Sequence, residues 1–246
     1  MWQWFHKLGS PKYVYPLCGK LLPWMAFFTT ALLVIGTVWG LFYAPADYQQ
    51  GNSFRIIYIH VPSAFMSMGT YTYIAVLAAI GIIWRMKLAD MFAVAIAPIG
   101  AAFTFVALFT GAVWGKPTWG TYWVWDARLT SELILLFLYF GLIALYHAIE
   151  DKQKAIKAFR ILALVGVVNV PIIHYSVHFW NTLHQGATLS KFEKPSMAPE
   201  MLWPLLINIL GTVLLFLTIG MMRLRNHILV SEKNTQWVKQ EVQHVL

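Results

Sequence analysis

Six long apolar stretches, almost free of charged side chains, constrain the fold of this chain more than any other feature. About 20 apolar residues cross the hydrocarbon core of a bilayer as one α-helix. The stretches predict six membrane spans, at about residues 21–46, 56–84, 91–113, 128–148, 161–183 and 201–222. Charged residues make up only 11% of the chain, against about 25% in soluble domains. We therefore expect an all-α integral membrane protein, with one six-helix membrane domain over residues 1–246.

The lysines and arginines predict how these spans are oriented. Six spans place both termini, the turn at 85–90 and the turn at 150–160 on one side of the membrane. Of the 18 lysines and arginines, that side receives all but Arg55, Lys116, Arg128, Lys191 and Lys194. Because cytoplasmic loops carry the excess of Lys and Arg, we expect both termini in the cytoplasm. The net charge of +8 then reflects topology and membrane lipids, and no nucleic-acid partner is expected.

A tryptophan-rich segment, residues 114–126, lies between the third and fourth predicted spans, on the outer side of the membrane in this topology. Tryptophans mark bilayer interfaces in general, but four indoles in one short segment exceed what an interface needs: Trp114, Trp119, Trp123 and Trp125. Their flat faces favour contact with lipid or with a planar ligand. Asp126 ends the segment, where it suits the N-cap of the next helix or a contact with that ligand.

Two histidines, His60 and His184, are expected at the same outer depth as the tryptophan-rich segment. Each alone is most simply a side chain that reaches the interface. Together, two imidazoles beside so many tryptophans indicate the axial ligands of a haem iron. Arg55 and Arg128 are candidates for binding the carboxylates of such a ligand, because guanidinium binds carboxylate in a bidentate fork. Arg128 and Glu132 are also spaced to form an ion pair on one helix face.

His174 and His178 lie four residues apart in the fifth predicted span, and therefore on one helix face. Such a pair can bind zinc, but no Glu lies between them and no third ligand follows nearby. Helix packing or a supporting hydrogen bond is the simpler interpretation, and both alternatives stay open. The single cysteine, Cys18, excludes an intrachain disulfide.

Residues 119–126, Trp-Gly-Thr-Tyr-Trp-Val-Trp-Asp, match the W-G-x-x-W-x-W-D signature of membrane proteins that handle haem in cytochrome c biogenesis. With six spans and this length, the whole chain resembles the CcmC family (haem exporter protein C) of bacterial cytochrome c maturation. The resemblance implies that residues 114–126 form a periplasmic platform for haem b, with His60 and His184 as axial ligands. It also implies an inner-membrane location, delivery of haem to the chaperone CcmE, and work beside CcmD and the ABC-type subunits CcmA and CcmB. No enzymatic activity is expected.

Two other functions fit parts of the sequence. A membrane b-type cytochrome would also use bis-histidine haem, usually with ligands inside the spans, and would retain it for electron transfer. His174 and His178 keep that alternative open. A secondary transporter would need inverted repeats and charges near the membrane midplane, and the sequence displays neither.

Overall fold

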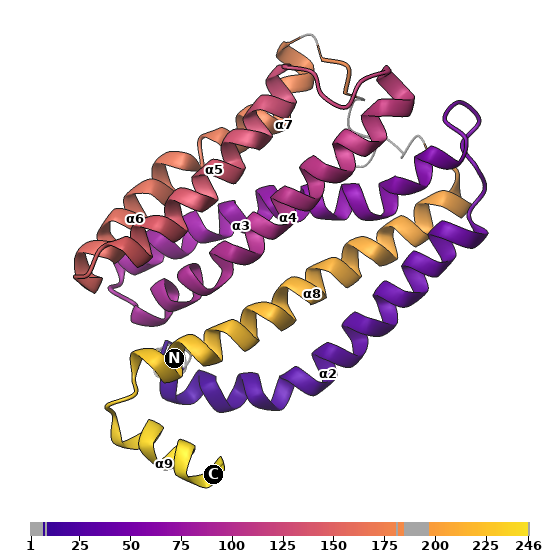
Figure 1. Ribbon diagram of the computed structural model, residues 1–246. Coiled ribbons are helices and arrows are strands. Elements are labelled where there is room, and N and C mark those ends of the chain that lie inside the picture. Colours follow the sequence, from indigo (N-terminus) through magenta and orange to yellow (C-terminus); the bar gives the residue numbers. More distant parts are fainter. Residues whose placement is uncertain (1–6, 8, 181, 185–196, 246) are drawn as a thin grey trace.

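The fold is a bundle of long α-helices, seen in a computed structural model that describes residues 7, 9–180, 182–184 and 197–245 (Figure 1). Within these residues, β-structure is limited to one isolated bridge between Asp47 and Gly51. Six helical segments are long and apolar enough to cross a membrane. This confirms the predicted all-α class and the number of spans, whereas the side of the membrane that each end faces stays a prediction.

The helices follow one another in the order of the predicted spans. The first span is α2 (Pro11–Val38), continued by a π-helical turn, η1 (Trp39–Tyr43). A short 3₁₀ helix, η2 (Asn52–Ile56), leads into α3 (Ile57–Ile83). The remaining helices are α4 (Lys87–Trp119), α5 (Ala127–Ala148), α6 (Lys152–Gly166), α7 (Asn169–Phe179), α8 (Pro199–Ser231) and α9 (Gln236–Val245).

Several helices extend beyond the apolar stretches that predict them, and two of these extensions matter here. α4 continues past Val113 to Trp119, so the first half of the tryptophan-rich segment is helical and not a loop as expected. It ends where Gly120 adopts a left-handed φ of 78°, which glycine adopts without a steric penalty. α8 continues past Met222 to Ser231. Its 33 residues are roughly 50 Å long, against about 30 Å for the hydrocarbon core, so its last turns lie outside the apolar layer.

The fifth span is broken between α6 and α7, at Val167 and Val168. Pro171 lacks the N–H that would bond to the backbone oxygen of residue 167, so the helical hydrogen bonds cannot continue there. The Asn169 side chain donates instead to the backbone oxygen of Ser131 on α5, 2.8 Å away. The break therefore coincides with a polar contact that ties α7 to α5.

The central core lies where α3, α4 and α5 pack together. Tyr139 of α5 is fully buried and faces Tyr71 of α3 edge-on, with 5.1 Å between ring centroids. Its hydroxyl donates to the backbone oxygen of Ser67 at 2.7 Å. Gly100 of α4 makes room for the Tyr139 ring, because a Cβ at that position would overlap it. Small residues and hydrogen bonds between helices are the usual means of holding helices together in a membrane.

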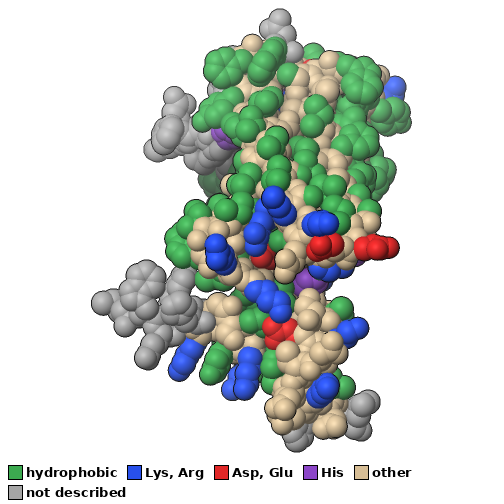
Figure 2. All heavy atoms as spheres, turned by 90° about the vertical axis from the view of Figure 1, so that its left-hand side faces the viewer, with side chains coloured by type: hydrophobic (Ala, Val, Ile, Leu, Met, Phe, Trp, Pro, Cys, Tyr) green, Lys and Arg blue, Asp and Glu red, His purple; other side chains and the backbone are tan. Residues whose placement is uncertain are grey.

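The two ends of the bundle differ in character. We name residues 85–90, 150–160 and 223–239 the basic end; Figure 2 shows Lys and Arg side chains gathered below an apolar upper surface. At this end Arg160 binds Asp90 through two hydrogen bonds of 2.7 and 2.5 Å. We name residues 44–56, 114–127 and 182–184 the aromatic end, which lies at the opposite end of the helices (Figure 1).

Replacing Gly100 with Ala should destabilise the folded protein by about 1–3 kcal/mol, because the added methyl group would press into the Tyr139 ring. Gly69→Ala is the matched control. Gly69 also lies in a membrane helix, but a Cβ placed on it meets no atom within 4 Å in the described part of the chain. Unfolding of the purified proteins in detergent measures both changes, and equal stabilities would contradict this account of the core.

Candidate functional site

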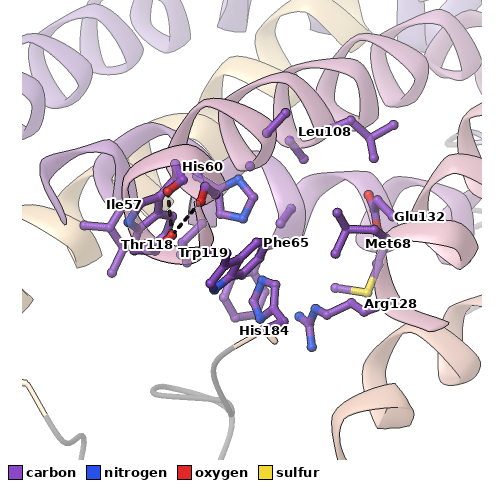
Figure 3. Close-up of a pocket in the computed structure, with 18 of the residues that line it drawn as sticks. Ile57, His60, Phe65, Met68, Leu108, Thr118, Trp119, Arg128, Glu132 and His184 are labelled. Carbon is purple, nitrogen blue, oxygen red and sulfur yellow. Dashed lines mark hydrogen bonds between the residues drawn. The ribbon is translucent and has the colours of Figure 1, made fainter. Parts of the chain in front are cut away.

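A cavity opens at the aromatic end, between α3, α4, α5 and α7 (Figure 3). Its volume is ≈ 180 Å³, roughly ten times what one water molecule needs. Most of its wall is apolar, with polar side chains at a few positions. The lining residues that matter for its chemistry are His60, Trp114, Trp119, Arg128, Glu132, His174 and His184.

His60 enters the cavity from the start of α3 and is held by a hydrogen bond to α4. Its Nδ1 lies 3.0 Å from Oγ1 of Thr110, and the residue is only 9% exposed. The Thr110 hydroxyl donates its single proton to the backbone oxygen of Val106, 2.6 Å away. It therefore accepts from His60, which puts the proton of the neutral imidazole on Nδ1. Nε2 keeps a lone pair that can bind a metal ion.

His184 reaches the cavity from residues 182–184, beyond the end of α7. Its backbone N–H donates to Oγ1 of Thr182 at 3.1 Å, and the Thr182 hydroxyl donates to Oδ2 of Asp126. The other oxygen of Asp126 accepts from the backbone N–H of Leu129 at 2.8 Å and so caps α5. Asp126 lies outside the cavity lining. It thus caps a helix and also ties the segment that carries His184 to that helix.

The two imidazole rings lie close together at the cavity. Their centroids are 6.3 Å apart and their planes are inclined by 34°. Two imidazoles on opposite sides of one metal ion, each about 2 Å from it, have ring centres roughly 6 Å apart. Among the described residues, no group of three or more His, Cys, Asp or Glu could hold a metal ion. A metal ion between His60 and His184 would therefore bring further ligands of its own, as a porphyrin does.

Two of the four tryptophans line this cavity. Trp114, in the last turns of α4, meets the His60 ring edge-on, with 5.6 Å between centroids. Its indole nitrogen donates to Oε1 of Gln50 at 2.7 Å, which fixes the ring. Trp119 is the last residue of α4, and its ring centroid lies 6.2 Å from that of His184. The two imidazoles are therefore each flanked by one indole.

The other two tryptophans lie outside the cavity lining. Trp123 and Trp125 pair edge-to-face, with 5.4 Å between centroids. Trp125 is 74% exposed. The indole nitrogen of Trp123 is buried and has no hydrogen-bond partner in the part of the chain that the structure describes. The role of this pair in ligand binding stays a prediction.

Arg128 and Glu132 lie one turn apart on α5, and both line the cavity. Glu132 is 9% exposed and accepts a hydrogen bond from Ser67 of α3 at 2.7 Å. Arg128 forms no salt bridge within 4.0 Å to any carboxylate in the described part of the chain. The ion pair considered from the sequence is thus not formed, and the Arg128 guanidinium can bind an anionic ligand.

Arg55 lies in η2, outside the cavity lining. Its guanidinium donates to the backbone oxygens of Gly40, at 3.3 Å, and of Leu41, and to the Asn52 side chain at 3.1 Å. These two carbonyls belong to η1, at the end of the first span, where helix carbonyls lack their usual partners. The Arg55 side chain therefore supplies hydrogen-bond donors to backbone carbonyl groups at the end of that helix.

The sequence did not predict three polar side chains that complete or support the cavity. His174 of α7 lines it, whereas its place deep in the fifth span suggested packing; the side chain of His178 lies outside the described ones. Thr110 and Ser67 hold His60 and Glu132. Helical spacing puts Thr110 on the same face as Trp114, but no sequence signal names its partner across the interface.

Asp126→Ala should lower stability by about 0.5–2 kcal/mol, because α5 loses its cap, and should loosen residues 182–184, because Thr182 loses its acceptor. Thr182→Val keeps the cap and removes only the tether. We expect hydrogen–deuterium exchange in peptides that cover residues 182–184 to rise in both variants. The unfolding temperature should fall clearly only in Asp126→Ala. Unchanged exchange in Thr182→Val would contradict the tether.

Comparison with known proteins identifies the family of this chain. The sequence model described as "Heme exporter protein C", CcmC, matches residues 4–239. The chain is 55% identical over 240 residues to the heme exporter protein C of Escherichia coli (strain K12), covering 98% of this chain and 97% of that protein. It is 53% identical over 239 residues to that of Haemophilus influenzae, covering 97% of each. It is 47% identical over 222 residues to that of Bradyrhizobium diazoefficiens, covering 90% and 84%. The chain belongs to the CcmC family of heme exporter proteins.

Proposed function

We propose that this chain binds haem b in the cavity at the aromatic end, on the periplasmic face of the bacterial inner membrane, and delivers it to the haem chaperone CcmE. The observation that carries the proposal is the separation of the His60 and His184 rings, 6.3 Å between centroids at one cavity. The name of the relatives, heme exporter protein C, supports haem as the ligand. The proposed role is to hold and hand over haem, without enzymatic activity.

Three kinds of contact would hold the haem. His60 and His184 would approach the iron from opposite faces, with Nε2 of His60 oriented by the hydrogen bond to Thr110. Trp114 and Trp119 would offer flat apolar surface to the porphyrin. Arg128, which has no ion pair among the described residues, would bind a propionate carboxylate.

His60 and His184, the proposed iron ligands, are held differently by the protein. This difference suits a haem that must leave the site. His60 lies within a helix and is 9% exposed. His184 lies beyond the end of α7 and is tied to α5 through Thr182 and Asp126. We infer that His184 leaves the iron first, when a ligand from the chaperone replaces it. The exposed Trp125 and its neighbour Trp123 would extend the platform toward that partner.

Orientation and partners rest on the sequence. The bias of lysines and arginines predicts that the basic end, with both termini, faces the cytoplasm. The sequence contains no nucleotide-binding loop, so energy from ATP would come from the ABC-type subunits CcmA and CcmB, with CcmD as a further partner. We treat residues 1–246 as one membrane domain with residues 114–126 as part of the haem platform.

The double variant His60→Ala/His184→Ala should purify with at most about a tenth of the wild-type haem, since both proposed iron ligands are gone. Absorption spectra give the haem content per protein. Trp24→Ala, at an exposed position of α2, is the control and should keep its haem. A double variant with the wild-type spectrum that still loads the chaperone would overturn the ligand assignment. Haem that is reduced by quinol and never leaves the wild-type protein would instead favour a b-type cytochrome.

Thr110→Val should speed the loss of haem to a scavenger protein about 10–100-fold, because residue 110 then lacks the oxygen that accepts the hydrogen bond from His60 and orients its ring. Valine has nearly the same shape as threonine, so packing changes little. Thr110→Ser retains the hydroxyl and should release haem at close to the wild-type rate. If the valine and serine variants released haem equally fast, the orienting role of Thr110 would be wrong.

A further inference from the structure

A second cavity lies at the basic end, between α4, α5, α6 and α8, with a volume of ≈ 260 Å³. It is lined by residues near the start of α4, in the middle of α6 and near the ends of α5 and α8, so it lies at the other end of the bundle from the proposed haem cavity. Part of its wall is apolar, with Val94, Ile143 and Phe159. The polar part contains Tyr146, His147, Arg223 and His227.

Arg223 is oriented at this cavity by the backbone of α4. Its Nε donates to the backbone oxygen of Ala95 at 2.7 Å. Among the described residues, this is its one hydrogen bond, and no carboxylate lies within 4.0 Å of it. Both terminal nitrogens of the guanidinium can therefore donate to an anion, in the fork geometry that suits phosphate oxygens.

Two acidic side chains at the basic end already have cationic partners. Asp90 is bound by Arg160 through two hydrogen bonds, and Glu232 is bound by Lys87 at 3.0 Å. Neither carboxylate is thus left to neutralise Arg223. Among the described residues, no salt bridge within 4.0 Å neutralises the Arg223 guanidinium, which leaves its charge available to an anion from outside the protein.

Further donors converge on the same cavity. The Tyr146 hydroxyl lies 3.3 Å from Nε2 of His227, and the two rings are 5.7 Å apart. His147 follows Tyr146 and meets its ring edge-on at 5.3 Å. Lys152 lies over the Tyr146 ring, 5.0 Å from its centroid, and donates to the Tyr146 backbone oxygen at 3.2 Å. Two imidazoles and a phenol thus line the same cavity as the guanidinium, and the Lys152 ammonium group lies against the phenol ring.

We propose that this cavity binds the phosphate group of an anionic phospholipid from the leaflet at the basic end. The last turns of α8, which carry Arg223 and His227, lie outside the apolar layer, at the depth of lipid headgroups. Basic pockets between membrane helices bind such headgroups. The adjoining apolar wall, with Val94, Ile143 and Phe159, fits the start of an acyl chain, which a free phosphate ion lacks. This favours a lipid over a soluble anion.

A lipid bound here would contact all four helices that line the cavity. Its phosphate would contact α8 through Arg223 and α5 through His147, while its glycerol and first acyl carbons would contact α4 and α6. The inference is independent of haem, because this cavity shares no lining residue with the haem cavity. Failure of one proposal therefore leaves the other standing.

Native mass spectrometry of the full-length protein in detergent, titrated with phosphatidylglycerol, tests the proposal. We expect one tightly retained lipid in the wild type and at least about ten-fold weaker retention in Arg223→Gln, which loses a charge-assisted bond to phosphate. Lys157→Gln is the matched control, because it removes one exposed positive charge from α6 at the same end but outside the cavity. It should retain the lipid as the wild type does.

Arg223→Lys separates lipid binding from folding. Lysine keeps the positive charge but loses both the fork geometry and the bond to Ala95. It should therefore retain the lipid less tightly than the wild type and clearly more tightly than Arg223→Gln. Loss of the lipid in Arg223→Lys to the same extent as in Arg223→Gln would mean that Arg223 acts only on the structure, and would overturn the proposal. Equal loss in Lys157→Gln, or displacement of the lipid by millimolar inorganic phosphate, would also overturn it, in favour of general charge attraction or a soluble-anion site.

Discussion

The close approach of α3 to α4 near Gly111 is the constraint on which the proposed haem cavity depends. A Cβ on Gly111 would lie 3.0 Å from Cε1 of His60, so a larger residue would press on the imidazole. With glycine there, the ring reaches the Thr110 hydroxyl at 3.0 Å. In a membrane interior, buried polar groups must find partners within the protein. The bond between His60 and Thr110 therefore gives each side chain a hydrogen-bond partner. It also leaves Nε2 as the nitrogen of His60 that can bind a ligand.

The other half of the site comes from chain segments far from His60 in the sequence. Asp126 caps α5 and accepts from Thr182, which holds the backbone of His184. The same helix carries Arg128 and Glu132 into the cavity. One carboxylate thus aligns the second imidazole and the helix that bears the candidate anion-binding group. The first histidine is held within a helix and the second by a short tether, which is the asymmetry on which the proposed haem transfer relies.

The sequence predicts the membrane spans and the convergence of the two histidines, because both follow from apolar length and from the alternation of helices across a bilayer. It does not predict contacts that depend on how each helix is rotated. Ser67 bonds Glu132, so the expected pair with Arg128 is not formed. α4 runs on to Trp119 because Lys116 donates to the backbone oxygen of Gly120, and Thr118 to that of Trp114, which lets polar residues remain helical. The Ser67–Glu132 bond joins residues far apart in the sequence, so no periodic pattern in the sequence predicts it.

The two ends of the bundle therefore carry different chemistry: tryptophans beside two imidazoles line the cavity at one, and most of the lysines and arginines gather at the other. The central claim is that His60 and His184 bind one haem iron together. Electron paramagnetic resonance of the ferric, haem-loaded protein tests it most directly, since the spin state reports the axial ligands. The account predicts a low-spin signal typical of two imidazole ligands, which changes when either histidine is replaced. A high-spin signal in the wild-type protein, or a low-spin signal that survives both replacements, would contradict it.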